Sequence, residues 1–343
     1  MKNMTTCTQT TLPPRDNYMQ AVRGLCIIAV VMIHIPPVSG VNISQQVINF
    51  AVAVFFFISG YFVKTETFSL KKRTLRTWLP YCLWTIFALL VYGISLRFLG
   101  GRKIDFDTYE IIKIIFFGGA APQLYFLSVL LQLTLLTPFL IKLIQQDNRV
   151  VDFVCWAVTP VYVAIMYLYD YITGSRFPLY CALFPAWFGF YYAGMVVRER
   201  NITLRVGNVT LVALLLLTLY LSLAESQLLE ARLPWMAVSQ IKFSSMLYAA
   251  AVIALVLRNR DPQQPAGLLS RIGDYSFGIY LIHIYVLVLI NKSVDSVFDN
   301  TILYPFLHSQ SVRIVLVVAI SYAIVSLLVK VVGEKAAKYL GLK

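Results

Sequence analysis

Arg23 and His34 are the two residues whose types and spacing best indicate chemistry. They lie eleven positions apart in the apolar segment 21–38. Because an α-helix has about 3.6 residues per turn, both side chains fall on one face. At a rise of about 1.5 Å per residue, roughly 16 Å separates them along the helix axis. If this helix crosses a membrane, the arginine lies near one interface and the histidine deep in the span, and ionisable groups at such depth usually serve a function.

His34 is our candidate general base, because a neutral imidazole can take a proton from a hydroxyl group. The simpler interpretation is a snorkelling interfacial cation for Arg23 and a hydrogen-bonded core side chain for His34. We favour the functional interpretation because the chain has only three histidines, and this one is in register with a membrane arginine. Pro36-Pro37 is expected to end the helix, since proline cannot continue its hydrogen-bond ladder.

A cluster of basic residues precedes the third apolar segment. Arg73 and Arg76 are three positions apart and share a face if this stretch is helical, with Lys71 and Lys72 beside them. Such a group of cations forms a cradle for phosphates, which predicts binding of a cytoplasmic donor such as a coenzyme A thioester. The alternative is topogenic charge that contacts lipid headgroups. Pro80 is expected to start the span that follows.

Two further groups of polar side chains are candidates for an acceptor path or for support of the site. Tyr125, Ser128 and Gln132 follow helical spacing and form one polar stripe. Tyr280 and His283 are three positions apart and share a face in a later segment. Both groups are also explained by hydrogen bonding and packing between helices, without chemistry.

The sequence offers no metal or nucleotide motif. Its five cysteines show no metal-type spacing and imply no disulfide framework. Neither a Gly-x-Ser-x-Gly elbow nor a Walker loop occurs. We therefore predict no bound metal or cofactor, and the sequence gives no support to a membrane serine hydrolase or an ATPase.

The elements that must position these residues are membrane helices. Hydrophobic residues make up 59% of the chain and charged residues 13%, which is more apolar surface than a soluble domain needs. The apolar windows are about 18–22 residues long, the length that crosses a bilayer, and their continuous character predicts helices rather than a barrel. We expect an all-α integral membrane protein, a bundle of about ten transmembrane helices over residues 21–38, 45–63, 78–99, 122–144, 150–170, 177–197, 206–224, 237–258, 275–292 and 311–333. Segment 111–120 is too short to span and is expected to be interfacial or re-entrant.

The net charge of +13 follows the predicted topology. With both termini in the cytoplasm, most Lys and Arg fall in cytoplasmic segments, which is the positive-inside pattern of membrane proteins. We therefore expect a lipid bilayer and no nucleic acid as partner. The predicted organisation is a polar tail over residues 1–20, one transmembrane domain over 21–333 and a short basic cytoplasmic tail over 334–343. The small residues Ser59-Gly60 are expected to allow close approach between helices.

Several motifs recur in a fixed order from residue 17 to about 290. They are Arg23-Gly24-Leu25 with His34, Phe56-Phe57-Ile58-Ser59-Gly60-Tyr61, the Arg73/Arg76 pair before Pro80-Tyr81, Tyr125-Phe126-Leu127, and Ser276-Phe277-Gly278-Ile279-Tyr280-Leu281-Ile282-His283. Together they resemble the acyltransferase 3 family of bacterial multi-pass membrane O-acyltransferases. One departure is Tyr125-Phe126, where the family often has Trp-Phe, so that an aromatic side chain is kept.

The resemblance implies roles for individual residues. His34 matches the essential histidine of the first helix, and Arg23 matches the arginine of the same motif. Arg73 and Arg76 match basic positions that meet the acyl-CoA. The motif that ends in His283 recurs in a later helix of the family without an assigned role. Members mostly acetylate sugar hydroxyls of surface glycans, such as O-antigen, common antigen, exopolysaccharide or peptidoglycan, while others modify small molecules or transfer succinyl groups.

These expectations combine into one leading hypothesis. The chain is expected to be an enzyme of the bacterial inner membrane that moves an acetyl group from cytoplasmic acetyl-CoA to a hydroxyl of a lipid-linked or surface glycan. Lys72 is expected to assist the two arginines at the donor phosphates, and Arg23 to steady either a phosphate or the thioester carbonyl. No fused extracytoplasmic domain is expected, so the enzyme acts alone or with a separate extracytoplasmic partner. Direct transfer and a covalent acyl-enzyme relay are both compatible with the position of His34.

Two other functions are compatible with the same residues. A glycan-lipid flippase or small-solute transporter could use Arg23 and His34 as a proton relay or headgroup site, although the two halves of the chain show no repeat. The other is a non-catalytic membrane partner of a separate transferase. Dependence on acetyl-CoA and a base-labile ester product distinguish the enzyme from a transporter, and loss of activity in His34→Ala would count against the non-catalytic partner.

Overall fold

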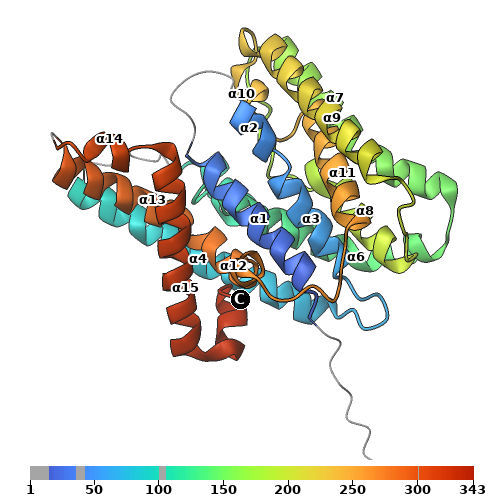
Figure 1. The fold of residues 1–343 in the computed structure, drawn as a ribbon, viewed down its shortest axis with the longest axis horizontal. Coiled ribbons are helices and arrows are strands. Elements are labelled where there is room, and N and C mark those ends of the chain that lie inside the picture. Colours follow the sequence, from blue (N-terminus) through green and yellow to red (C-terminus); the bar gives the residue numbers. More distant parts are fainter. Residues whose placement is uncertain (1–14, 36–42, 100–105, 300) are drawn as a thin grey trace, which may run out of the picture.

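The protein is helical throughout the part that the structure describes. The computed structural model describes residues 15–35, 43–99, 106–299 and 301–343. Pro36-Pro37 and most of the predicted N-terminal tail lie outside these residues. The helices, shown in Figure 1, are α1 (Asn17–Ile33), α2 (Ile43–Ile48), α3 (Ala51–Tyr61), α4 (Leu70–Leu99), α5 (Thr108–Phe117), α6 (Tyr125–Gln145), α7 (Arg149–Thr173), α8 (Pro185–Glu199), α9 (Asn208–Glu230), α10 (Pro234–Ala237), α11 (Phe243–Arg258), α12 (Leu268–Asp274), α13 (Ser276–Phe298), α14 (Tyr304–Leu307) and α15 (Gln310–Leu340).

Each of the ten predicted windows contains a helix. Among the described residues, seven helical segments are long and apolar enough to cross a membrane: α2 with α3, α4, α6, α7, α9, α13 and α15. The helices α1, α8 and α11 are shorter, with 17, 15 and 16 residues. The structure therefore supports a multi-pass membrane protein, while a count of ten spans stays a prediction. Segment 111–120 contains only the short helix α5.

Two predicted helix boundaries are wrong. Pro80 does not start its span but lies inside α4, which begins at Leu70. The helix tolerates this proline by giving up the one hydrogen bond that its missing N–H would donate. The first helix starts at Asn17 rather than Ala21, because the Asp16 side chain caps it by accepting from the backbone N–H of Met19.

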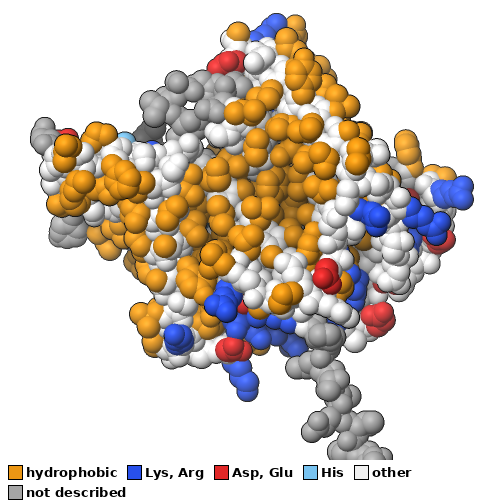
Figure 2. Space-filling view, viewed as in Figure 1, with side chains coloured by type: hydrophobic (Ala, Val, Ile, Leu, Met, Phe, Trp, Pro, Cys, Tyr) orange, Lys and Arg blue, Asp and Glu red, His pale blue; other side chains and the backbone are white. Residues whose placement is uncertain are grey.

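The helices α1 and α3 lie at the centre of the molecule (Figure 1). α1 packs along α12, and α3 packs along α8. α7, α9 and α11 lie on one side, and α13 and α15 on the other. Figure 2 shows hydrophobic side chains across the middle of one face and Lys and Arg gathered along its lower edge. Outer apolar side chains such as Phe153 and Val209 are 72% and 86% exposed, as expected for contact with lipid.

Glycines let the central helices cross at close range. A Cβ atom on Gly60 would lie 2.0 Å from the carbonyl oxygen of Tyr191, and one on Gly194 would lie 2.1 Å from that of Phe57. Both positions belong to the crossing of α3 with α8, so the backbones touch there. This confirms the close approach predicted at Ser59-Gly60.

A buried lysine joins three other helices. Lys242, directly before α11, has no exposed surface. Its Nζ donates to Gln46 Oε1 of α2 (2.8 Å), Ser222 Oγ of α9 (2.6 Å) and Ser245 Oγ of α11 (2.9 Å). A buried ammonium is tolerated only when protein oxygens replace its water. This arrangement therefore fixes α2, α9 and α11 relative to one another.

Both ends of the described chain lie at the same end of the molecule. Arg15 pairs with Asp274 at the end of α12. At the other terminus, Gly333 adopts φ 79° and interrupts α15, a conformation that favours glycine. The last turns of the chain fold back from this point (Figure 1). As a result, the predicted C-terminal tail is helical and returns to the bundle.

We predict that Gly60→Ala destabilises the protein, because the added methyl group forces α3 and α8 apart at a cost of about 1–3 kcal/mol. Gly93→Ala in α4 is the matched control, since a Cβ atom there meets nothing within 4 Å. Thermal unfolding of the detergent-purified variants should show a lower midpoint for Gly60→Ala and an unchanged or higher one for Gly93→Ala. Equal midpoints for the two variants would contradict the observed crossing.

Candidate functional site

Four cavities follow one another in a row, each sharing lining residues with the next, and most of the predicted site residues line them. We name them the outer cleft, the basic cavity, the histidine cavity and the far cavity. Arg73 and Arg76 line the first two. Tyr280 lines the second and third. Tyr125 lines the third and fourth.

The outer cleft and the basic cavity gather the predicted basic cluster. Lys72, Arg73 and Arg76 project from the first turns of α4 into the outer cleft, which has a volume of about 740 Å³. Arg73 Nη2 donates to the carbonyl oxygen of Ser59 (2.8 Å), which holds its guanidinium against the end of α3. Arg76 is exposed, so its guanidinium is available to a ligand. The expectation that the two arginines share a helix is confirmed.

Arg23 and Lys343 complete the basic cavity, which has a volume of about 290 Å³. Arg23 is half-buried on α1, and its Nη1 donates to Gln20 Oε1 at 3.4 Å. Lys343 reaches the cavity because the chain turns back at Gly333, and it pairs with Glu334. Four cations thus line a cavity whose described lining residues include no carboxylate. Such a site favours an anionic ligand such as a phosphate.

His34 ends α1 and lines the next cavity. It is the C-cap residue, so it lies at the end of the helix rather than within it. The histidine cavity has a volume of about 630 Å³, and its walls include His34, Tyr125 and Tyr280. Arg23 and His34 therefore line successive cavities rather than a common one. The structure groups Arg23 with the basic cluster of α4 and groups His34 with α13.

His283 lies beside His34, and their ring centroids are 5.1 Å apart. His283 has no exposed surface. Its Nδ1 is 2.7 Å from the carbonyl oxygen of Tyr280, and because a carbonyl can only accept, Nδ1 carries the proton. Nε2 is then an unprotonated acceptor, and it has no hydrogen-bond partner among the described residues. A buried acceptor in this position is suited to receive an N–H from His34 and to orient that ring.

Tyr280 forms the wall between the basic cavity and the histidine cavity. Its hydroxyl donates to the carbonyl oxygen of Gln123 (2.6 Å), which holds the ring in place. The ring packs against Phe126 and His283, with centroid distances of 5.2 Å and 5.7 Å. A ligand in the basic cavity is therefore separated from His34 by one aromatic side chain.

The predicted polar stripe on α6 divides into one cavity residue and two supporting residues. Tyr125 lines the histidine and far cavities. Ser128 Oγ donates instead to the carbonyl oxygen of Phe116. Gln132 donates to the carbonyl oxygen of Ala182 and accepts from the backbone N–H of Phe184, both at 2.9 Å. These bonds hold α5 and the turn before α8 against α6.

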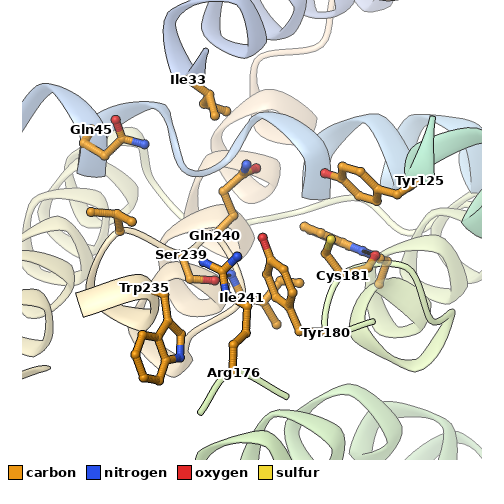
Figure 3. Close-up of a pocket in the computed structure, with 12 residues that line it drawn as sticks. Ile33, Gln45, Tyr125, Arg176, Tyr180, Cys181, Trp235, Ser239, Gln240 and Ile241 are labelled. Atoms are coloured by element: carbon orange, nitrogen blue, oxygen red, sulfur yellow. Dashed lines mark hydrogen bonds between the residues drawn. The ribbon is translucent and has the colours of Figure 1, made fainter. Parts of the chain in front are cut away.

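Apart from Tyr125, the far cavity is lined by residues that the sequence analysis did not single out. It has a volume of about 280 Å³, and Figure 3 shows polar and aromatic side chains converging on it from α2, from the 174–184 loop and from the segment around α10. These side chains include Gln45, Arg176, Tyr180, Trp235 and Gln240. No local pattern links such distant residues. The only sign of this cavity in the sequence is that aromatic and polar residues occur where the apolar windows begin or end.

The comparisons with known proteins concern the chain as a whole. A family model for an acyltransferase domain matches residues 16–331, which is nearly the whole chain. The match includes α1, the basic cluster of α4 and the histidine of α13, and it ends before Lys343. No curated protein and no solved structure matches the chain.

Proposed function

The chain belongs to the acyltransferase 3 family, and we propose that it is a membrane O-acetyltransferase. The acyl donor is cytoplasmic acetyl-CoA, and the acceptor is a hydroxyl of a lipid-linked or cell-surface glycan. One observation carries the proposal: a cavity lined by four basic side chains and the cavity lined by His34 lie on either side of Tyr280. An acyltransferase must hold an anionic donor and must activate a hydroxyl group, and these residues suit the two tasks.

The donor phosphates bind at the basic end. Arg73 and Arg76 of α4 contact them, with help from Lys72 in the outer cleft and Lys343 in the basic cavity. The acyl end of the donor extends along the basic cavity toward Tyr280. Since acetyl-CoA is cytoplasmic, this end of the molecule and both chain termini face the cytoplasm, and the protein lies in the bacterial inner membrane. The basic residues at this end agree with the positive-inside rule.

His34 acts as the general base from the histidine cavity. It takes the proton of the acceptor hydroxyl while that oxygen attacks the thioester carbonyl carbon. The carbon–sulfur bond then breaks, the ester forms, and the departing thiolate of coenzyme A takes the proton from His34. Arg23 lines the donor side, where it stabilises negative charge that develops on the carbonyl oxygen. The two substrates meet at the ring of Tyr280.

His283 positions the base. Its Nε2 makes no hydrogen bond to the described residues in this structure; once both substrates are bound, the neighbouring imidazole of His34 turns to donate an N–H to it, which leaves the other nitrogen of His34 directed to the acceptor. The short bond from its Nδ1 to the Tyr280 carbonyl sets this tautomer. His283 therefore acts through His34 and does not contact the substrates.

We predict that His34→Ala abolishes acetyl transfer, with a loss of at least about 10²-fold, because the acceptor hydroxyl loses its base. Inverted membrane vesicles of the native strain contain the acceptor and expose the cytoplasmic face. After addition of radiolabelled acetyl-CoA, base-labile label should enter a glycan or glycolipid fraction with the wild type and not with the variant at matched protein level.

Sealed vesicles of the opposite orientation are the control for sidedness. They should give little label, because acetyl-CoA does not cross the membrane to the basic end. Equal label in wild type and His34→Ala would remove His34 as the base. An absence of ester in both, with acceptor demonstrated, would instead favour a transporter that uses the same buried residues.

Arg76→Ala is predicted to raise the acetyl-CoA concentration needed for half-maximal rate by about tenfold, with a smaller effect on the maximum rate. This side chain is exposed and makes no contact that holds α3, unlike Arg73. Arg205→Ala is the matched control, since Arg205 is exposed and lines none of the four cavities. Loss of turnover at saturating acetyl-CoA in Arg76→Ala would argue against a role confined to donor binding.

Substitutions of His283 should affect the rate constant and not the donor requirement. His283→Leu removes the acceptor that orients His34, and we expect a maximum rate lower by about 10²-fold. His283→Gln can place an amide oxygen near the position of Nε2 and should restore part of that rate. Steady-state kinetics in the same vesicles provide the measurement. If the leucine and glutamine variants are equally impaired, His283 has a packing role only.

A further inference from the structure

The far cavity continues the row beyond His34. It shares Ile33, Tyr125, Arg176, Tyr180 and Gln240 with the histidine cavity, so a molecule bound there is next to the cavity that His34 lines. Its position is opposite to the basic cavity along this row. No residue of the proposed donor site lines it. The far cavity therefore suits the second substrate.

The walls of the far cavity combine rings with hydrogen-bonding groups (Figure 3). Trp235 and Tyr180 provide flat apolar surfaces, and Gln45 and Gln240 provide amides. The Oε1 atom of Gln240 is buried without a hydrogen-bond partner among the described residues. Amides both donate and accept, as sugar hydroxyls do, and aromatic rings stack on the C–H faces of sugar rings. This combination is suited to a carbohydrate.

Arg176 adds one positive charge to this cavity. Its guanidinium lies 4.5 Å from the centroid of the Tyr180 ring, and it forms no ion pair with a carboxylate in the described part of the chain. The nearby carboxylate of Asp170 is already engaged: it accepts from the backbone N–H of Phe177 (2.7 Å) and from Trp235 Nε1 (2.8 Å). These two bonds hold the loop and the indole that frame the cavity. Arg176 is exposed and forms no ion pair in the described part of the chain, so its guanidinium is available to an anion at this rim.

We infer that the far cavity is the acceptor subsite and that it takes an anionic sugar, whose carboxylate or phosphate binds Arg176. This inference rests on the proposed acetyl transfer and specifies its substrate class. The sugar ring stacks on Trp235 beside Arg176, and the hydroxyl to be acetylated points toward His34. A guanidinium binds both carboxylate and phosphate through two parallel hydrogen bonds, so the two anions share one recognition chemistry.

The test uses the full chain in native inverted vesicles with radiolabelled acetyl-CoA. After mild acid has removed any phosphate that joins the glycan to a lipid, the labelled glycan should still bind to an anion-exchange resin. Loss of that retention after reduction of carboxyl groups identifies a sugar acid, and loss after phosphatase treatment identifies a sugar phosphate. Arg176→Gln should lower the labelling rate at limiting acceptor by about tenfold or more. Arg176→Lys should retain part of the wild-type labelling rate. The acetyl-CoA requirement should stay unchanged in both variants.

Arg232→Gln is the matched control. Arg232 also stacks on a tyrosine, 3.9 Å from the centroid of the Tyr171 ring, but it does not line the far cavity. Its variant should label at the wild-type rate. A neutral labelled glycan, or an equal effect of Arg176→Gln and Arg232→Gln, would overturn the subsite. A wild type that forms no labelled ester would instead remove the proposed function, and this inference with it.

Discussion

Polar groups inside an apolar bundle must find their partners within the protein, and this constraint shapes the site. Lys242 is the clearest case, because its buried ammonium is held by oxygens of Gln46, Ser222 and Ser245. The backbone oxygen of Ser222 and the hydroxyl of Ser244 also accept from this ammonium, so neutral oxygens of several helices share the replacement of its water. The segment that leads into Lys242 lines the far cavity. The position of that wall therefore depends on a lysine that touches no substrate.

Close helix crossings and irregular chain turns act together with this network. The crossing at Gly60 places the end of α3 where the Ser59 carbonyl can hold Arg73. The turn at Gly333 brings Lys343 back to the same cavity. At the other end of the row, Asp170 fixes the loop that carries Arg176. The long helices form most of the cavity walls. The turn at Gly333 and the loop before α8 position Lys343 and Arg176.

The sequence predicted the helical windows well because hydropathy is a local property that each segment carries by itself. It also predicted the α4 arginines as neighbours, since a spacing of three is decisive on a helix. It failed at Pro80, because tertiary packing overrides a local tendency to break the helix. The pairing of His34 with His283 and the position of Arg176 could not be predicted, since both depend on contacts between segments far apart in the chain. The same reason explains why Ser128 and Gln132 could not be separated from Tyr125.

The wall formed by Tyr280 has a consequence for the energetics of the cell. A row of cavities that ran open through a membrane protein would conduct protons and discharge any proton gradient across that membrane. One aromatic ring, held by Gln123 and packed on Phe126, lies between the basic cavity and the histidine cavity. Under the proposed function, only the two carbon atoms and one oxygen of an acetyl group have to pass this ring, which is a smaller unit than a hydrated ion. The protein would in this way link two compartments chemically and keep them electrically insulated.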